Sequence, residues 1–341
     1  MADPTIISRR TLFFAPLVLA ACKNRTSIIE LTGATMGTSY AIVAVDRSGT
    51  LSQSKVQAAV DDVLTRVNVQ MSNWDAGSEV SRFNAWKSTD AFAVSPEFER
   101  VMAAAEEVHG LSGGHFDVTT GPLIDLWGFG AGPGSNTMPS DAAIAAALET
   151  TGQARHISVD AGALTKAAPG AQVYLSAIGK GHGVDAIGEA LQTLGIEDFM
   201  VEIGGDLLTA GVNPDGNPWK IGIETPNPFD RSVQKVVSVS GQGLATSGDY
   251  RNYFERDGVR YSHILNAKTG RPITHRTASA TVLTENAMLA DAWATAMLIL
   301  GSETGLNVAD ALDMPVLFID RDAATDGFVT RPSDSFAALT A

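Results

Sequence analysis

Asp291 and Thr295 stand four residues apart in the run MLADAWATAM (288–297), where the other residues are apolar. This composition predicts a buried helix over about 286–300, and a buried helix normally excludes an unpaired carboxylate. Residues four apart share a helix face, so the carboxylate and the hydroxyl could bind one hard cation such as Mg²⁺, which prefers oxygen ligands. In the alternative interpretation, Asp291 caps a neighbouring loop and Thr295 bonds back to its own helix.

A second candidate lies in YLSAIGKGHGVD (174–185), where glycines at 179, 181 and 183 flank Lys180. The segment 178–195 is typical of a glycine-rich turn that leads into a helix. Backbone amides at a helix N-terminus, together with one lysine, could cradle a phosphate. A tight packing turn is the other interpretation. The spacing matches neither the Walker A loop nor the dinucleotide-binding G-x-G-x-x-G pattern.

A third candidate is His263 in RYSHILNAKTGRP (260–272), after a predicted strand and before a turn. A histidine there is suited to acid–base chemistry near neutral pH, or it serves a structural role through a bond to a backbone carbonyl. The segments 71–84 and 112–130 are rich in glycine and aromatic residues. They could line a flat slot for a ring, or they form core and turns.

The elements that must position these residues follow from hydrophobic periodicity and capping signals. Helices are predicted over 51–72, from Ser95-Pro96 through 111, from Ser140 to Gly152, and in a short piece from 302. Strands are predicted over 39–45, 199–205, 219–225, 234–241, 252–262 and 278–284, with 315–320 as the closing strand. Because strands and helices do not alternate steadily, the pattern favours an α+β fold with much antiparallel sheet. The stretch 128–140 is predicted to be a mobile surface loop.

Composition sets further bounds. The chain has 341 residues, of which 45% are hydrophobic and 18% charged, and a formal net charge of −14. These proportions are ordinary for a globular protein. Such an acidic surface argues against binding to nucleic acid and against electrostatic adhesion to anionic lipid. Cys22 is the only cysteine, so no intrachain disulfide can form.

The first 24 residues are typical of an export signal rather than of a folded element. Arg9 and Arg10 precede an apolar run over 11–21 that is too short to span a bilayer but suits a signal peptide. The pair resembles a twin-arginine signal, and Leu19-Ala20-Ala21-Cys22 resembles a bacterial lipobox. We therefore expect a periplasmic protein anchored to a membrane by a lipid on Cys22, with residues 27–341 as the folded domain. The alternative is a buried N-terminal helix with an incidental cysteine.

Taken together, the segments resemble one family, the ApbE-type flavinyl transferases, or FAD:protein FMN transferases. The resemblance runs in order from about Thr32 to Gly301. It rests on TMGTSY, MSNWDAGSEVSRFN, GHFDVTTGPL, LSAIGKGHGVD, EIGGDL, ATSGDYRNYF, YSHILNAKTGRP and ADAWATAM. It implies an α+β fold of mixed, largely antiparallel sheets with packed helices.

The resemblance implies an enzyme that splits FAD at its pyrophosphate, attaches FMN through a phosphoester to a Thr or Ser hydroxyl of a partner protein, and releases AMP. The expected acceptor is a flavoprotein of the cell envelope, and a respiratory flavoprotein is one candidate. Two other functions are open. One is an Mg²⁺-dependent pyrophosphatase that cuts FAD to FMN and AMP with water. The other is a non-catalytic flavin-binding lipoprotein.

The resemblance also assigns residues. Mg²⁺ would be held by the backbone carbonyl of Ala177 and the side chains of Asp291 and Thr295, so that Asp291 takes part in catalysis. An acid–base role falls to His263. The residues expected to contact FAD are Met36, Trp74, His115, Phe116, Asp117, Tyr174, Lys180, His263 and Leu265.

Two positions depart from the family's usual pattern. Tyr174 stands where an Asp associated with the bound dinucleotide is usual, which bears on ligand preference and turnover. Asn266-Ala267 stands where Asp-Pro is commoner, a milder change that could loosen the turn.

Overall fold

The computed structural model describes residues 26–130, 138–229, 232–325 and 327–340. The predicted export signal, with Cys22, and most of the predicted loop over 128–140 lie outside these residues. The elements are β1 (Ser27–Thr35), β2 (Thr38–Asp46), α1 (Gln53–Met71), α2 (Glu79–Ala85), β3 (Phe92–Ala93), α3 (Pro96–Leu111), α4 (Gly121–Leu126), α5 (Asp141–Leu148), α6 (Gln153–His156), β4 (Ile157–Asp160), β5 (Ala163–Lys166), α7 (Gly179–Thr193), β6 (Asp198–Ile203), β7 (Asp206–Ala210), β8 (Trp219–Glu224), β9 (Val233–Val239), β10 (Gly243–Gly248), β11 (Tyr253–Arg256), β12 (Val259–Ser262), β13 (Leu265–Asn266), β14 (Arg271–Pro272), β15 (Thr277–Thr284), α8 (Ala287–Ala311), β16 (Val316–Arg321), β17 (Phe328–Pro332) and α9 (Asp334–Leu339).

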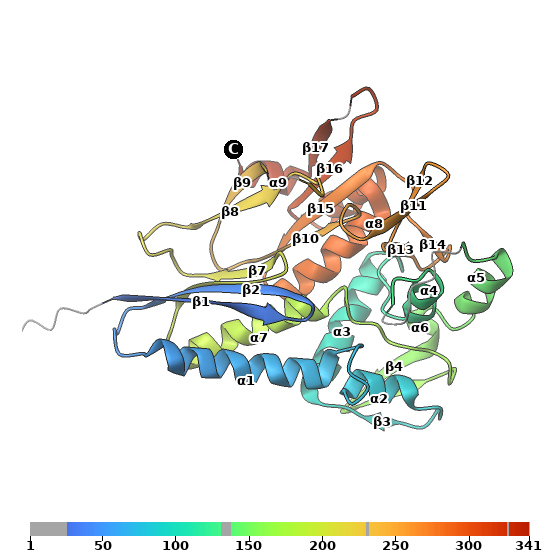
Figure 1. The fold of residues 1–341 in the computed structure, drawn as a ribbon, viewed down its shortest axis with the longest axis horizontal. Coiled ribbons are helices and arrows are strands. Elements are labelled where there is room, and N and C mark those ends of the chain that lie inside the picture. Colours follow the sequence, from blue (N-terminus) through green and yellow to red (C-terminus); the bar gives the residue numbers. More distant parts are fainter. Residues whose placement is uncertain (1–25, 131–137, 230–231, 326, 341) are drawn as a thin grey trace, which may run out of the picture.

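An eight-stranded sheet in the order β1-β2-β6-β7-β10-β15-β16-β17 organises the fold (Figure 1). Every neighbouring pair in it is antiparallel. β7 pairs with β10 only through Leu207 and Leu208, opposite Leu244 and Gly243. The rest of β10 is therefore free of β7, and this opening in the sheet is where the candidate site lies. The α+β, largely antiparallel architecture predicted from the sequence is confirmed.

Alternating side chains of the sheet feed two separate hydrophobic cores. On β16, Val316 and Phe318 join the large core with α1, α3, α7 and α8, whereas Leu317 and Ile319 join a smaller core under the β8–β9 hairpin and α9. Figure 1 shows α1 and α7 on one side of the sheet and β8, β9 and α9 on the other. Helix α8 is thus buried in the large core, directly beneath the strands that border the opening.

The helix starts predicted at Ser95 and Ser140 are capped as expected, because their side chains accept backbone hydrogen bonds at the starts of α3 and α5. Ser52, which was not predicted as a cap, does the same for α1. In each case the hydroxyl satisfies an N–H group that has no partner within the helix. Helix α5 ends at Leu148, before the predicted stop at Gly152.

Helix α8 carries the run that contains Asp291 and Thr295. It begins after Asn286, whose side chain accepts a hydrogen bond from the Leu289 amide, and it is interrupted at Gly301, which has φ 72°. The prediction of a helix to about 300 followed by a short helix from 302 therefore agrees with the backbone. Within the described residues no helix, α8 included, is long and apolar enough to cross a membrane.

The elements at the two edges of the sheet were not predicted from the sequence. Strand β1, strand β17 and helix α9 had no predicted counterpart, and the prediction of 315–320 as the closing strand is wrong because β17 pairs beyond it. The exposed side chains of β17 leave it without a clear alternation of apolar and polar residues. Its place depends on pairing with β16, which a local pattern does not reveal.

Candidate active site

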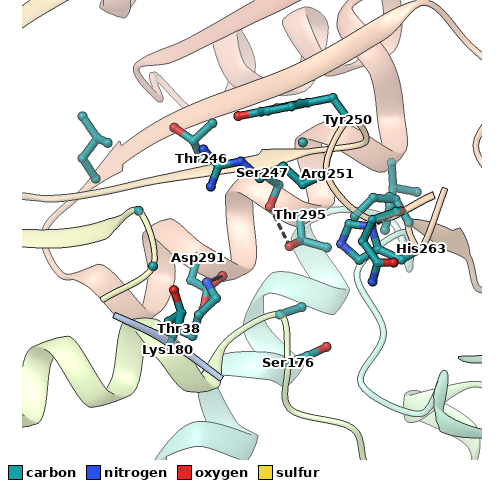
Figure 2. Close-up of a pocket in the computed structure, with 18 of the residues that line it drawn as sticks. Thr38, Ser176, Lys180, Thr246, Ser247, Tyr250, Arg251, His263, Asp291 and Thr295 are labelled. Carbon is teal, nitrogen blue, oxygen red and sulfur yellow. Dashed lines mark hydrogen bonds and ion pairs between the residues drawn. The ribbon is translucent and has the colours of Figure 1, made fainter. Parts of the chain in front are cut away.

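A cavity of about 600 Å³ opens between α7, α8, β8, β10 and the segment after β12. Its volume is within the range of roughly 300–1,000 Å³ that is typical of small-molecule sites. Figure 2 shows part of its lining. Ten of the residues singled out from the sequence line it: His115, Phe116, Asp117, Tyr174, Ala177, Lys180, His263, Leu265, Asp291 and Thr295.

The negative charge of the buried Asp291 is compensated by a cationic side chain, that of Lys180. Asp291 is only 3% exposed. Its Oδ1 lies 3.5 Å from the Lys180 Nζ, and the Lys180 ammonium is in direct contact with the Asp206 carboxylate. Burial acts to lower the pKa of Lys180, but the two carboxylates outweigh burial and raise it, so the ammonium stays charged. Burial and then Asp291 raise the pKa of Asp206, whereas Lys180 lowers it. By formal charge the cluster has one positive and two negative groups.

Gly181, which follows Lys180, allows two helices to pack closely. The Gly181 amide donates to Asp291 Oδ2 at 3.1 Å, and a Cβ at Gly181 would lie 2.2 Å from the Ala287 carbonyl oxygen. Only glycine lets α7 approach α8 this closely. Asp185, one turn further along α7, accepts hydrogen bonds from the amides of Ala287 and Met288 at 2.8 and 2.9 Å. The glycine-rich segment thus fixes the start of α8 against α7. Its Gly181 amide donates to the Asp291 carboxylate.

Thr295 does not bond back to its own helix. Its Oγ1 lies 3.0 Å from the Ser247 Oγ of β10, and both residues line the cavity (Figure 2). Ala177 also lines the cavity, in the turn before α7. The carboxylate of Asp291 and the hydroxyl of Thr295 therefore belong to residues of the same cavity wall as Ala177. Within the described ranges no group of three or more His, Cys, Asp or Glu side chains could hold a metal ion.

His263 is half-buried at the cavity wall, and its ring is fixed from one side. Nδ1 lies 3.0 Å from the Asn252 carbonyl oxygen. Because a carbonyl can only accept, Nδ1 carries the proton and Nε2 keeps a free lone pair. Burial lowers the pKa of His263, so the neutral ring predominates at pH 7. The bond to the carbonyl is the structural interaction considered for this residue, and it orients the ring so that Nε2 can accept a proton.

An aromatic stack supports His263 from the 112–130 segment. Trp127 stacks on Tyr261 and Tyr261 on Phe254, with centroids 5.9 and 5.3 Å apart. Phe254 stacks on Phe129, whose ring meets His263 edge-on at 6.3 Å. Trp127 and Phe129 of this segment therefore pack in a small satellite core, whereas Phe116 belongs to the large core.

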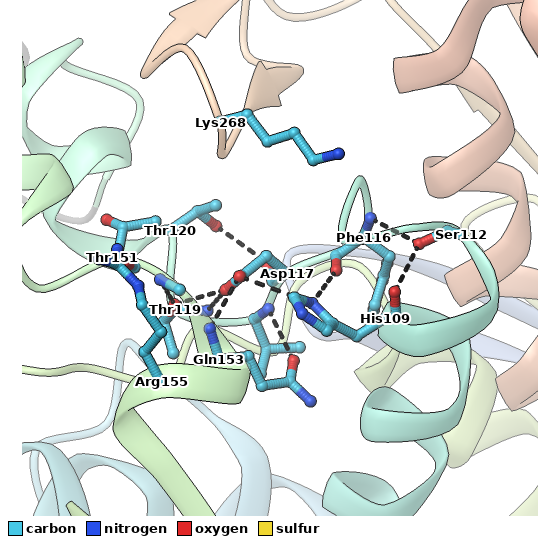
Figure 3. Close-up of polar contacts among 12 residues, drawn as sticks. His109, Ser112, Phe116, Asp117, Thr119, Thr120, Thr151, Gln153, Arg155 and Lys268 are labelled. Carbon is cyan, nitrogen blue, oxygen red and sulfur yellow. Dashed lines mark hydrogen bonds and ion pairs between the residues drawn. The ribbon is translucent and has the colours of Figure 1, made fainter. Parts of the chain in front are cut away.

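Asp117 is held by its own loop. Its carboxylate accepts hydrogen bonds from the Thr119 hydroxyl, from the Thr119 amide at 2.7 Å and from the Gln153 amide at 2.8 Å (Figure 3). His109 Nδ1 lies 3.6 Å away. Both carboxylate oxygens are thus occupied by partners that join the loop to α6, which fits a structural role.

His115 contrasts with Asp117, because its Nδ1 is buried without a hydrogen-bond partner among the described residues. Burial, and then the nearby Lys268 ammonium, lower the pKa of His115. His115 therefore contributes a neutral imidazole to the cavity wall, with its Nδ1 buried and unpaired.

Trp74 and Met36 lie away from the lining of the main cavity. Trp74 is 61% exposed and meets the Tyr174 ring edge-on, with centroids 5.5 Å apart. The two rings border a second cavity of about 680 Å³, so Tyr174 stands between the two spaces. Burial raises the pKa of the Tyr174 hydroxyl to about 12. The Met36 side chain packs on Gly183 of α7, where a Cβ would lie 2.7 Å from its Cε.

Several residues of the site were missed in the sequence. Asp206, Ser247 and Asn252 contact Lys180, Thr295 and His263, and Asp185 holds α8. Asp206 and Ser247 belong to EIGGDL and ATSGDYRNYF, two segments that carry the family resemblance but suggest no role for these residues. The glycine pair directly before Asp206 was the one local signal that could have drawn attention to it.

Comparison with known proteins agrees with this arrangement. The ApbE family model matches residues 36–318. Curated proteins named FAD:protein FMN transferase are similar along their lengths. That of Vibrio cholerae is 44% identical over 320 residues, covering 94% of this chain and 95% of its own. That of Escherichia coli K12 is 33% identical over 349 residues, covering 97% of both.

Solved structures show the same fold. The flavin transferase ApbE from Vibrio cholerae superposes with a TM-score of 0.85 at 42% identity, covering 92% of this chain and 99% of that one. The apo form of the Pseudomonas stutzeri flavinyl transferase ApbE gives 0.85 at 37% identity, covering 92% and 97%. The chain therefore belongs to the ApbE family, as its sequence segments predicted, and the curated relatives in that family are named as transferases.

Proposed function

We propose that this protein is an FAD:protein FMN transferase that uses Mg²⁺ to transfer FMN from FAD to a Thr or Ser hydroxyl of a cell-envelope flavoprotein. One observation carries the proposal. A buried carboxylate with an incomplete set of partners, Asp291, and a neutral histidine with a free Nε2, His263, line one cavity large enough for a nucleotide. The names of the relatives supply the substrate, FAD, and the protein acceptor.

The residues present fit a magnesium ion. Ala177, Asp291 and Thr295 would hold it through a carbonyl, a carboxylate and a hydroxyl, and Mg²⁺ prefers oxygen ligands and keeps waters and substrate phosphates. The cluster of Lys180, Asp206 and Asp291 has one negative charge in excess, which a cation would offset. Bound there, Mg²⁺ would supply positive charge to the pyrophosphate and to the AMP leaving group.

His263 supplies the proton acceptor in this proposal. The acceptor hydroxyl oxygen forms a bond to the phosphorus on the FMN side, the phosphoanhydride bond to AMP breaks, and AMP leaves with the bridging oxygen. The hydroxyl proton passes to Nε2 of His263, which is free because Nδ1 donates to the Asn252 carbonyl. Lys180, with its ammonium at the cavity wall, adds positive potential for the phosphates.

A single assay separates this function from its alternatives. The purified protein is incubated with FAD, Mg²⁺ and an acceptor polypeptide that contains Thr or Ser. Flavin fluorescence that stays on the acceptor in a denaturing gel supports the transferase. Free FMN with an unlabelled acceptor identifies a pyrophosphatase, and FAD that stays intact under all conditions identifies a non-catalytic flavin-binding protein.

The place of action is part of the same proposal. Residues 1–24 have the features of a twin-arginine signal with a lipobox, so Cys22 would carry a lipid and the protein would work in the periplasm, held at a membrane. Only four residues separate Cys22 from Ser27, where β1 begins. A lipid there would keep the edge of the sheet near the membrane surface, where an envelope flavoprotein could be reached.

Replacing Arg9 and Arg10 by Lys tests the export route. We expect the variant to accumulate as an unprocessed cytoplasmic precursor, measured by fractionation and by mass spectrometry of the mature N-terminus. Normal lipidation of Cys22 in that variant would contradict the twin-arginine assignment while leaving the enzymatic proposal intact.

A further inference from the structure

Asp206 is a buried carboxylate beside Lys180. It opens β7 after the Gly204–Gly205 turn and is 1% exposed. Lys180 and Asp291 line the cavity, whereas Asp206 is absent from its lining. The Asp206 carboxylate is in direct contact with the Lys180 ammonium, and the neighbouring Asp291 carboxylate adds to burial in raising the pKa of Asp206.

Lys180 stands between two carboxylates that compete for it. Its ammonium contacts Asp206 and remains 3.5 Å from the Asp291 Oδ1, beyond normal hydrogen-bond distance. The other oxygen of Asp291 accepts a hydrogen bond from the Gly181 amide. Without the Asp206 carboxylate, the ammonium would close on Asp291, because an unpaired charge in a buried site is costly.

We propose that Asp206 is a positioning residue that neutralises Lys180 and holds it off Asp291, so that Asp291 keeps the charge with which it binds a divalent cation. This inference rests on the proposed function, which places the cation at Asp291. The formal charge of the three side chains is −1 in the native chain. It becomes 0 when Asp206 is replaced by Asn, and −1 again when Lys180 is also replaced by Met.

These charges predict that one substitution weakens cation binding and that a second substitution restores it. Asp206→Asn leaves Lys180 and Asp291 as a neutral pair, so the fold is retained but the cation must displace an ammonium. We expect the dissociation constant of a divalent cation to rise at least about tenfold, because a pair this close in a buried site is stronger than one in water. Adding Lys180→Met removes the competitor, and cation affinity returns to within a few-fold of the native value.

The experiment uses the full chain without flavin and Mn²⁺ alone as the probe, with bound and free ion measured by electron paramagnetic resonance. The proteins compared are the native chain, Asp206→Asn, Asp206→Asn with Lys180→Met, and Asp291→Ala. Asp198→Asn is the matched control, because Asp198 is a buried carboxylate at the start of β6 that pairs with Arg47 at 2.5 Å. Thermal unfolding of each variant checks that it is folded.

Loss of Mn²⁺ binding in Asp206→Asn and its return in the double variant support the inference, since a merely structural role would not be rescued by removing a second side chain. Native affinity in the single variant, or loss that persists in a folded double variant, overturns it. If the native chain binds no Mn²⁺, or binds it equally well after Asp291→Ala, the metal site of the proposed function fails instead. The two failures are therefore distinguishable.

Discussion

Asp291 and Asp117 are both buried carboxylates at the wall of one cavity, yet their surroundings differ. Asp117 accepts three hydrogen bonds from Thr119 and Gln153 and serves to join its loop to α6. Asp291 receives one backbone amide and an ammonium that is shared with Asp206. A carboxylate whose oxygens are filled by the protein is structural, whereas one left with a partial set is available to a ligand.

The largest effect is expected at Asp291. Asp291→Ala removes a proposed ligand but leaves Lys180 and Asp206 as a balanced pair, so the fold should be retained. We expect FMN transfer to fall by at least about 10³-fold, because metal-assisted charge stabilisation is worth several kcal/mol. Initial rates with saturating Mg²⁺ measure it, with the melting temperature as the control. Full activity would refute the metal assignment and remove the contrast with Asp117.

His263→Ala should have the next largest effect. Loss of the proton acceptor is expected to lower kcat by roughly 10²-fold, with little change in the FAD dissociation constant measured by titration. Because burial lowers the pKa of His263 below its ordinary value of 6.5, the native rate should stay constant as pH falls towards 6.5 and decline only below it. A variant that binds FAD poorly but turns over at the native rate would reassign the residue to binding.

Asp117→Asn tests the other side of the comparison. An amide has one accepting oxygen, so either the Thr119 or the Gln153 donors lose their partner. We expect the free energy of unfolding to fall by about 3 kcal/mol, since hydrogen bonds to charged groups are worth about 1.5–3 kcal/mol. Urea unfolding measures this, and kcat per folded molecule should change only a few-fold. Unchanged stability with weak FAD binding would make Asp117 a ligand contact.

The smallest effect concerns a buried group outside the cavity, His182 of α7, which is 1% exposed and whose Nε2 has no partner among the described residues. Burial lowers its pKa from 6.5 to about 4. The unfolded chain therefore binds the proton first, and the stability present above pH 6.5 is lost as pH falls towards 4.

Compared with His182→Gln, the native chain should lose about 2 kcal/mol more between pH 7 and pH 5. Urea unfolding at the two pH values measures this difference. Asp185, whose pKa burial raises to about 6, titrates with the opposite sign in both proteins, so the comparison between them isolates His182. Equal losses in both proteins would show that this histidine is not held neutral.

Local sequence patterns were sufficient to predict those helices and strands that bury one face of their own residues. The periodicity of 51–72, the Ser95-Pro96 cap and the alternation of 39–45 predicted α1, α3 and β2, because capping and amphipathic order depend on neighbours in the chain. The edge strand β17 was not predictable in this way, since its residues are mostly exposed and only pairing with β16 holds it.

The sequence by itself determined that Asp291 and Thr295 share a face, because a helix places residues four apart together. It determined the family as well, through the order of its segments. Only the tertiary structure decided which charge meets Asp291. Lys180, Asp206 and Asp291 lie on α7, β7 and α8, and the closeness of α7 to α8 at Gly181 brings them together. Electrostatic partners in a buried site are set by distance in space, which separation along the chain does not encode.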